Sequence, residues 1–228
     1  MELTKIIITA MKEEAEIIIK RFDLHEIDNK HNVTVFEGKR ISNNGNEKII
    51  LVLSGIGKIQ AAIATTYILE NYKPDKIVNI GIAGNLNSEE VKIGDVFLPN
   101  TFIQHDMYLP FEGEHLDYAK KPIFIEYAIG KSYDLKKFNL ILSGVCLTGD
   151  QFIDNEEKVS ELKNTYGADV CEMEAFAILS VAKQYGVLDK CVVIKAISDG
   201  ANNEAIDAHM NNLDFAVGNS VDILELVL

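Results

Sequence analysis

The chain has 228 residues and a formal net charge of −13 at pH 7, with acidic residues spread along its whole length. A field of this sign repels phosphate backbones and anionic lipids, so we expect neither nucleic acid nor a membrane as a partner. No apolar run is long enough to span a bilayer, and no signal peptide precedes the first apolar run. Three cysteines stand far apart in apolar runs, which is typical of reduced thiols. We therefore expect one domain over residues 1–228 with a well-buried core, in a cytoplasmic protein.

Apolar β-type runs alternate with helical stretches, which predicts an α/β fold around one mostly buried sheet. In chain order we expect a strand at 5–9, a helix at 12–21, strands at 33–38 and 49–54, a helix at 59–72, strands at 76–80, 95–98 and 140–148, a helix at 156–166, a strand at 168–171, a helix at 175–185, a strand at 192–197 and a helix from 213 to the end. Asn43-Asn44-Gly45 predicts a hairpin turn. Residues 104–122 show no period, and we interpret them as a functional loop.

Glycines or carboxylates follow six of the predicted strands. In sheets of this kind ligands bind beyond the carboxyl ends of the strands, so these residues predict one binding site at that rim. Glu14 opens a helix, where acidic residues are common, and Asp199 could simply cap a turn. The segments concerned are Met11–Glu14, Gly55–Gly57, Gly81–Gly84, Gly149–Phe152, Glu172 and Asp199.

Two carboxylates, Glu172 and Glu174, stand one residue apart and frame Met173. Two like charges 4 Å apart repel by ~1 kcal/mol even in water, and by more in a drier site. A ligand rich in hydroxyl groups would give both carboxylates partners, and the Met173 thioether offers a polarizable surface to a flat ring. The alternative interpretation is that both glutamates form the acidic first turn of a helix.

Several familiar chemistries are not indicated. Gly55-Ile56-Gly57 begins like a dinucleotide fingerprint, but the third small residue is replaced by Gln60. No phosphate-binding loop, no histidine spacing typical of a metal site and no nucleophile motif occurs in the sequence. His105 could be either a substrate contact or a solvated surface residue. The chemistry that the sequence still indicates is acid–base chemistry by carboxylates.

Seven short motifs, in this order, resemble the bacterial 5′-methylthioadenosine/S-adenosylhomocysteine nucleosidases of the purine nucleoside phosphorylase superfamily. The resemblance spans residues 5 to about 217. It implies a three-layer α/β/α sandwich around a twisted mixed sheet, a homodimer in which the partner completes the 5′ pocket, and hydrolysis of the N-glycosidic bond of an adenine thionucleoside with no cofactor and no metal. The motifs are Ala10–Glu14, Ser54–Lys58, Gly81–Gly84, Ile93–Asp95, Thr148–Ile153, Cys171–Ala175 and Lys195–Asp199.

The resemblance also implies roles for individual residues. Asp199 would protonate adenine N7, Glu14 would deprotonate the attacking water, and Glu174 would hold the ribose 2′- and 3′-hydroxyls. The remaining substrate-binding candidates are Phe152 stacking on adenine, the Ile153 backbone reading its edge, Met173 against the ribose, Glu172 in support, and Met11, Ile82, Lys195 and His105 around the sugar and the 5′ group. This division of labour fits the chemistry, because a breaking glycosidic bond needs an acid on one side and an activated water on the other.

Two positions depart from the family pattern. Ile82 stands where the family usually has serine, and Lys195 where it usually has arginine, which loses the bidentate fork of the guanidinium. These changes leave open a non-catalytic nucleoside-binding protein on the same fold. A phosphate-dependent purine nucleoside phosphorylase is the other alternative, but Glu13 and Glu14, with only Lys12 nearby, would repel phosphate.

Overall fold

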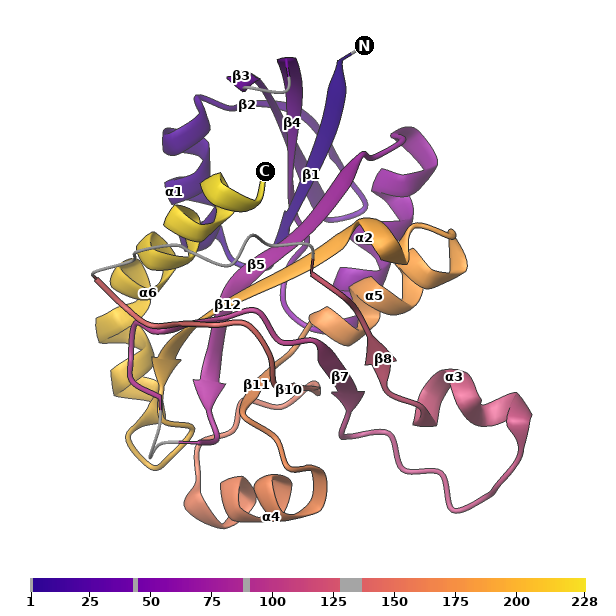
Figure 1. Ribbon diagram of the computed structural model, residues 1–228, viewed down its shortest axis with the longest axis vertical. Coiled ribbons are helices and arrows are strands. Elements are labelled where there is room, and N and C mark those ends of the chain that lie inside the picture. Colours follow the sequence, from indigo (N-terminus) through magenta and orange to yellow (C-terminus); the bar gives the residue numbers. More distant parts are fainter. Residues whose placement is uncertain (1, 43–44, 88–90, 128–136) are drawn as a thin grey trace.

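The structure, a computed structural model, describes residues 2–42, 45–87, 91–127 and 137–228. Within these ranges the strands form one mixed twelve-stranded sheet that lies between two layers of helices, which confirms the expected α/β architecture (Figure 1). Asn43 and Asn44 of the expected hairpin turn lie outside the described residues. Among the described helices, none has the length and apolar character needed to cross a membrane.

The bounds of the elements are as follows. The strands are β1 (Leu3–Thr9), β2 (His25–Lys30), β3 (Val33–Ser42), β4 (Gly45–Leu53), β5 (Lys76–Asn85), β6 (Val96–Phe97), β7 (Thr101–Gln104), β8 (Ile123–Phe124), β9 (Leu140–Ile141), β10 (Val145–Thr148), β11 (Val170–Glu172) and β12 (Cys191–Asp199). The helices are α1 (Lys12–Phe22), α2 (Lys58–Asn71), α3 (Asp117–Lys120), α4 (Glu156–Tyr166), α5 (Ala175–Gln184) and α6 (Ala205–Val227), with 3₁₀ turns η1 (Glu114–Leu116) and η2 (Leu188–Lys190).

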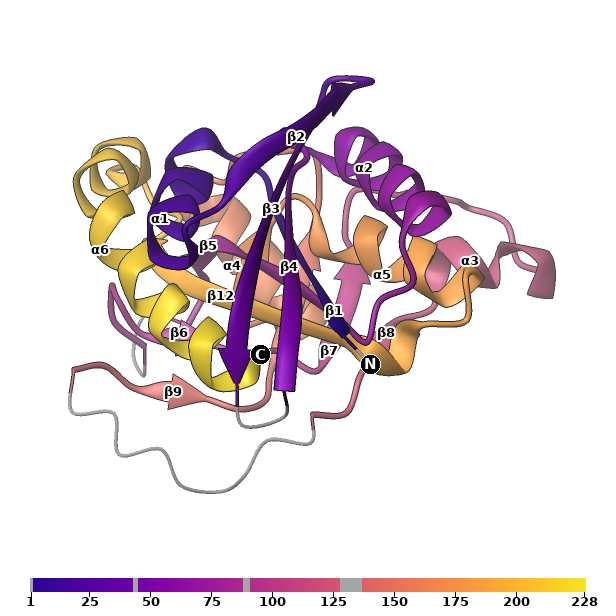
Figure 2. The same cartoon turned by 90° about the horizontal axis from the view of Figure 1, so that it is seen from above.

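The three layers follow from the period of two along the strands. In β1, Ile6 and Ile8 belong to one buried cluster and Ile7 to the other, because successive side chains point to opposite faces of a sheet. Helices α2 and α5 cover the face of Ile6, and α1 and α6 cover the face of Ile7 (Figure 2). Both faces of β1 are therefore dry, which explains its uninterrupted run of isoleucines.

Strand β5 is the point where the sheet branches. Its first half pairs in parallel with β1 on one side and β12 on the other, and its last residues, Gly84 and Asn85, pair antiparallel with β11. Cys171 lies opposite Gly84, so β11 reaches the middle of the sheet from the opposite direction to β1 and β12. The ends of β1, β11 and β12 therefore converge beside the second half of β5.

The predicted central strand was too short at its carboxyl end. The sequence analysis placed Gly81–Gly84 after a strand ending at Ile80, whereas β5 continues through these glycines to Asn85. The physical reason is close approach, since a Cβ on Gly81 would lie 2.8 Å from Oε1 of Glu14, and one on Gly84 would lie 3.1 Å from Oδ1 of Asp199. The glycines leave room for carboxylates and do not end the strand.

Other boundaries also differ from the prediction. The expected strand 140–148 is two strands, β9 and β10, separated at Gly144, whose φ of 143° lies in the region that favours glycine. Helix α6 begins at Ala205, eight residues before the predicted start. Three strands were not expected, because β2 is polar and exposed and β7 and β8 are short. Residues 104–122 contain η1 and α3 and extend away from the body (Figure 1).

Candidate active site

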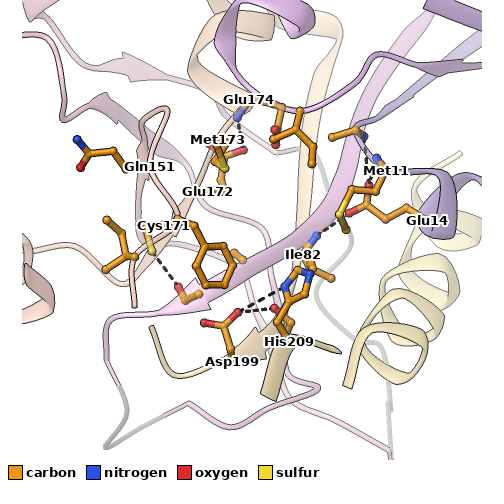
Figure 3. Close-up of a pocket in the computed structure, with 17 residues that line it drawn as sticks. Met11, Glu14, Ile82, Gln151, Cys171, Glu172, Met173, Glu174, Asp199 and His209 are labelled. Atoms are coloured by element: carbon orange, nitrogen blue, oxygen red, sulfur yellow. Dashed lines mark hydrogen bonds and ion pairs between the residues drawn. The ribbon is translucent and has the colours of Figure 1, made fainter. Parts of the chain in front are cut away.

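A cavity of about 170 Å³ lies where β1, β5, β11 and β12 converge. Most of the site residues predicted from the sequence line it (Figure 3). These are Met11, Glu14, Ile82, Phe152, Ile153, Glu172, Met173, Glu174 and Asp199. The structure thus brings together side chains that are up to 188 positions apart, from Met11 to Asp199.

Glu14 is a buried carboxylate held by four hydrogen bonds. It occupies the third position of α1, so that its Oε2 accepts from the backbone N–H groups of Ala10 (3.1 Å) and Met11 (2.9 Å) at the start of the helix. Oε2 also accepts from the Thr9 hydroxyl at 2.6 Å, and Oε1 accepts from the N–H of Ile82 at 3.2 Å. Backbone donors and the helix N-terminus both stabilise a negative charge at this point. Glu14 is a suitable base.

Asp199 closes β12 on the other side of the cavity and is 2% exposed. Its Oδ2 accepts from the Ser198 hydroxyl at 2.7 Å, and its Oδ1 accepts from the N–H of Ala201 at 2.8 Å. Nδ1 of His209, a residue of α6, lies 3.9 Å from Oδ2. Asp199 therefore accepts from fewer backbone N–H groups than Glu14 does. Its other neighbour is the imidazole of His209.

Glu172 supports the site without being free for a ligand. Its Oε2 accepts from the N–H groups of Glu174 (3.0 Å) and Ala175 (2.9 Å) at the start of α5. Oε2 also pairs with Nζ of Lys195 at 2.7 Å, and Oε1 accepts from the Thr148 hydroxyl. All of these groups are buried, so the pair has excellent geometry and further hydrogen bonds, as a buried ion pair requires.

Glu174 precedes α5 and faces the cavity. Its Oε1 accepts from the N–H of Gly57 at 2.9 Å, which ties the start of α5 to the start of α2. Burial raises the pKa of Glu174 to about 7; the Lys195 ammonium lowers the pKa, and the Glu172 carboxylate raises it. The same two carboxylates keep the pKa of Lys195 above its ordinary value against the effect of burial. Near neutral pH, Glu174 can therefore both donate and accept a hydrogen bond.

An apolar part of the cavity complements the carboxylates. Phe152 is 44% exposed and its ring meets the His209 ring edge to face, with centroids 5.6 Å apart. Ile153 is buried beneath it, in a cluster with Leu147 and Ala201. An exposed aromatic face beside a buried carboxylate suits a flat, polar ring.

Two predicted residues do not line the cavity. Lys195 lies behind Glu172 and acts on the site through that carboxylate. His105 follows β7, with its ring against Gly149 and its Nε2 buried without a partner, and burial lowers the pKa of its imidazole.

Four further lining residues received no individual role in the sequence analysis: Gln151, Cys171, Ser198 and His209. Three of them adjoin predicted site residues, and that adjacency was the available signal. His209 had none, because it lies ten positions after Asp199 in a stretch with no expected element. Burial raises the pKa of the Cys171 thiol well above its ordinary value, so the thiol stays protonated and is no nucleophile.

The chain is similar to known proteins over nearly its whole length. A family model described as the phosphorylase superfamily matches residues 4–228. The 5′-methylthioadenosine/S-adenosylhomocysteine nucleosidase of Geobacillus sp. (strain WCH70) is 31% identical over 228 residues, which cover 96% of this chain and 94% of the relative.

Two solved structures from Helicobacter pylori are similar over nearly the whole chain. One is a 5′-methylthioadenosine/S-adenosylhomocysteine nucleosidase with butyl-thio-DADMe-Immucillin-A, with a TM-score of 0.85, 25% identity, and coverage of 98% of this chain and 97% of the other. The other is a futalosine hydrolase, with a TM-score of 0.81, 25% identity, and coverage of 99% and 97%.

Proposed function

This chain belongs to the phosphorylase superfamily, and we propose that it hydrolyses the N-glycosidic bond of 5′-modified adenosines such as 5′-methylthioadenosine and S-adenosylhomocysteine, releasing adenine and the free sugar. The observation that carries this proposal is the placement of Glu14, Glu174 and Asp199, from three different elements, around one cavity with an exposed aromatic ring. The curated relatives at about 31% identity are nucleosidases of these substrates.

The proposed reaction separates charge, and the two ends of the cavity match it. As the bond between C1′ and N9 breaks, negative charge grows on adenine and positive charge on the sugar. Asp199 gives a proton to N7 of the base, which Phe152 holds by stacking. Glu14 takes a proton from the water that attacks C1′, and its four hydrogen-bond donors fix the orientation of the carboxylate.

Glu174 holds the ribose in this proposal. Hydrogen bonds donated by the 2′- and 3′-hydroxyls favour the ionised form of Glu174 and offset the burial that raises its pKa to about 7. Lys195 acts indirectly, because its ammonium fixes Glu172 and Glu172 fixes the N–H groups at the start of α5. The single contact between Lys195 and Glu172 supplies a positive charge without the bidentate fork of the arginine that the family usually has.

Water is a better nucleophile than phosphate for this cavity. In the described part of the chain no lysine or arginine lines it, and Lys195 is already paired with Glu172. A phosphate dianion beside Glu14 would meet uncompensated negative charge. The side chain of Ile82, which stands where the family usually has serine, adds an apolar wall instead of a hydroxyl donor.

A second copy of the chain is part of the proposal. Ile59 and Tyr118 are each 71% exposed and border a hollow of about 580 Å³ between α2, α5 and the segment 104–123. Ile56, 55% exposed, lines the active-site cavity just before α2. Exposed apolar side chains around a hollow are typical of an interface, and a partner seated on them would complete the 5′ end of the cavity. The buried free thiols support a cytoplasmic location.

The test is adenine release measured by liquid chromatography, with 5′-methylthioadenosine, S-adenosylhomocysteine, adenosine and futalosine as substrates, each with and without phosphate. We expect phosphate-independent release of adenine and a free reducing sugar from the 5′-modified adenosines. A phosphorylated sugar and a requirement for phosphate would identify a phosphorylase. Tight binding of adenine without any turnover would identify a non-catalytic binding protein.

A further inference from the structure

Asp199 is almost completely buried, although the proposed function, on which this inference rests, requires it to regain a proton in every cycle. Its side chain is 3% exposed. The Ser198 hydroxyl and the Ala201 N–H that donate to it are not sources of a net proton, because each would have to be reprotonated in turn. With so little of its side chain exposed, this acid would be reprotonated faster through a neighbouring group that contacts solvent.

His209 is placed between Asp199 and solvent. It comes from the second turn of α6, lines the cavity, and brings Nδ1 to 3.9 Å from Oδ2 of Asp199 (Figure 3). Its side chain is 19% exposed, so the ring touches both the buried acid and water. The distance is longer than a hydrogen bond, so proton transfer between the two groups requires a rotation of one side chain or one bridging water.

The other titratable groups of the cavity are engaged elsewhere. Glu14 is held at the start of α1, Glu172 is paired with Lys195, and Glu174 is held by Gly57. The Cys171 thiol faces the Gly84 carbonyl at 3.7 Å, and its raised pKa keeps the proton on sulfur. Among the described residues that line the cavity, His209 is the one basic side chain.

We propose that His209 is the positioning residue that returns the proton to Asp199 between turnovers. In the cycle, Asp199 gives its proton to adenine N7 as the C1′–N9 bond breaks, and the proton of the attacking water goes to Glu14, which releases it to solvent. The imidazolium of His209 then gives its Nδ1 proton to Oδ2 of Asp199. The neutral imidazole takes a proton from water, so the charges and the proton count return to their starting values.

The same ring has a structural contact that the experiment must separate from proton transfer. His209 packs edge to face on Phe152, with the two ring planes at 83°, so that losing the imidazole also removes support from the ring that stacks on the base. A packing role would affect mainly KM for the nucleoside. A proton-transfer role affects kcat and responds to an external proton donor.

The experiment is chemical rescue with imidazole, measured as adenine release from 5′-methylthioadenosine by wild type, His209→Ala, His209→Gln and the double variant His209→Ala with Asp199→Asn. We expect kcat of His209→Ala to fall by about tenfold or more, in keeping with the usual size of proton-transfer effects. Added imidazole should restore a large part of that kcat. His209→Gln, which fills the space without carrying a proton, should be slow and insensitive to imidazole.

Two controls define the result. His25→Ala changes an exposed histidine on β2 and should behave as wild type with and without imidazole. The double variant should gain nothing from imidazole, because the acid that receives the proton is absent. A gain there, an unchanged kcat in His209→Ala, or a slow His209→Ala that imidazole does not rescue would each overturn the relay. Failure of the wild type to release adenine would overturn the proposed function as well, so the two failures are distinguishable.

Discussion

Glu14 and Asp199 are both buried carboxylates, yet their hydrogen-bond partners differ. Glu14 accepts from three backbone N–H groups and a hydroxyl, whereas Asp199 accepts from one N–H and a hydroxyl and faces His209. Backbone N–H groups are fixed hydrogen-bond donors, and such donors favour the charged form of a carboxylate, which is the form that acts as a base. A neighbour that exchanges protons suits an acid. The environment therefore assigns different roles to two side chains of similar chemistry.

The role of Asp199 leads to the first prediction. Asp199→Asn should keep the fold, because an amide oxygen still accepts from the Ala201 N–H. It should lose about 10²- to 10⁴-fold in kcat, since an amide cannot protonate the leaving base. The measurements are kcat by adenine release and nucleoside binding by calorimetry, where we expect retained affinity. Turnover close to wild type would remove Asp199 from the mechanism.

The raised pKa of Glu174 predicts a pH-dependent stability. Burial raises this pKa from an ordinary 4.5 to about 7, so the folded protein holds the proton more tightly than the unfolded chain between these values. The contribution of Glu174 is then favourable at low pH and is lost as pH rises through about 7. Glu174→Gln, which keeps an acceptor for the Gly57 N–H, should gain in melting temperature relative to wild type as pH increases from 5 to 8.

The control for this prediction is Glu13→Gln, an exposed neighbour at the start of α1. Its melting temperature relative to wild type should show no comparable rise over the same pH range. Differential scanning fluorimetry of the protein without nucleoside is sufficient, because bound ribose would favour the ionised carboxylate and hide the effect. A constant difference between Glu174→Gln and wild type would contradict the assignment of a raised pKa to Glu174.

At the scale of elements, β5 positions both ends of the site through its glycines. Gly81 lies against Glu14 and Gly84 lies against Asp199, so one strand sets the separation of the proposed base and acid. A Cβ on Gly81 would lie 2.8 Å from Oε1 of Glu14, closer than real contacts allow. The same glycines misled the sequence analysis, because glycine after an apolar run usually indicates the end of a strand.

Gly81→Ala should therefore displace the Glu14 carboxylate while the strand remains paired. We expect kcat to fall by about tenfold or more, because a misplaced base loses much of its effect. The matched control is Gly218→Ala in α6, where a Cβ would meet nothing within 4 Å. That change should leave kcat unaltered and stabilise the helix by roughly 0.5–1 kcal/mol. Equal activity of the two variants would show that Glu14 has room to move.

Sequence patterns predicted the elements that bury a complete apolar face and missed those that do not. Helix α4 was predicted with its observed bounds, since Asn155 caps its start and Gly167 closes it. The first two turns of α6 carry exposed Ile206 and Met210 and face the cavity through His209, so they have no apolar period to recognise. His209, the lining residue for which the sequence offered no signal, lies in that part of the chain for the same physical reason.

At the scale of the whole molecule, the site depends on contacts that no local pattern contains. Glu174 accepts a hydrogen bond from the N–H of Gly57, 117 positions away. Nζ of Lys58 forms ion pairs with Asp106 at 2.5 Å and with Asp150 at 3.9 Å. These bonds fix the segments after β7 and β10 against the start of α2. The sequence analysis could place the segments at one rim by strand order. It could not derive which side chains of the rim would meet, because register and twist decide that.

The last prediction concerns the exposed apolar residues Ile59 and Tyr118, which border the 580 Å³ hollow, and Ile63, which is 40% exposed one turn after Ile59 on α2. If a second copy covers it, the wild type should have the mass of a dimer in multi-angle light scattering. Ile59→Glu with Ile63→Glu should give a monomer, because two charges would be buried unpaired at the interface. In the proposed dimer the partner completes the 5′ end of the cavity, so the monomer should lose more kcat/KM for 5′-methylthioadenosine than for adenosine, which has only a hydroxyl there. The control is Ile41→Glu, on an isoleucine that is 86% exposed on β3, which should remain dimeric and active. A wild type that is monomeric at assay concentration, or a monomeric variant with equal losses for both nucleosides, would contradict a 5′ pocket shared between subunits.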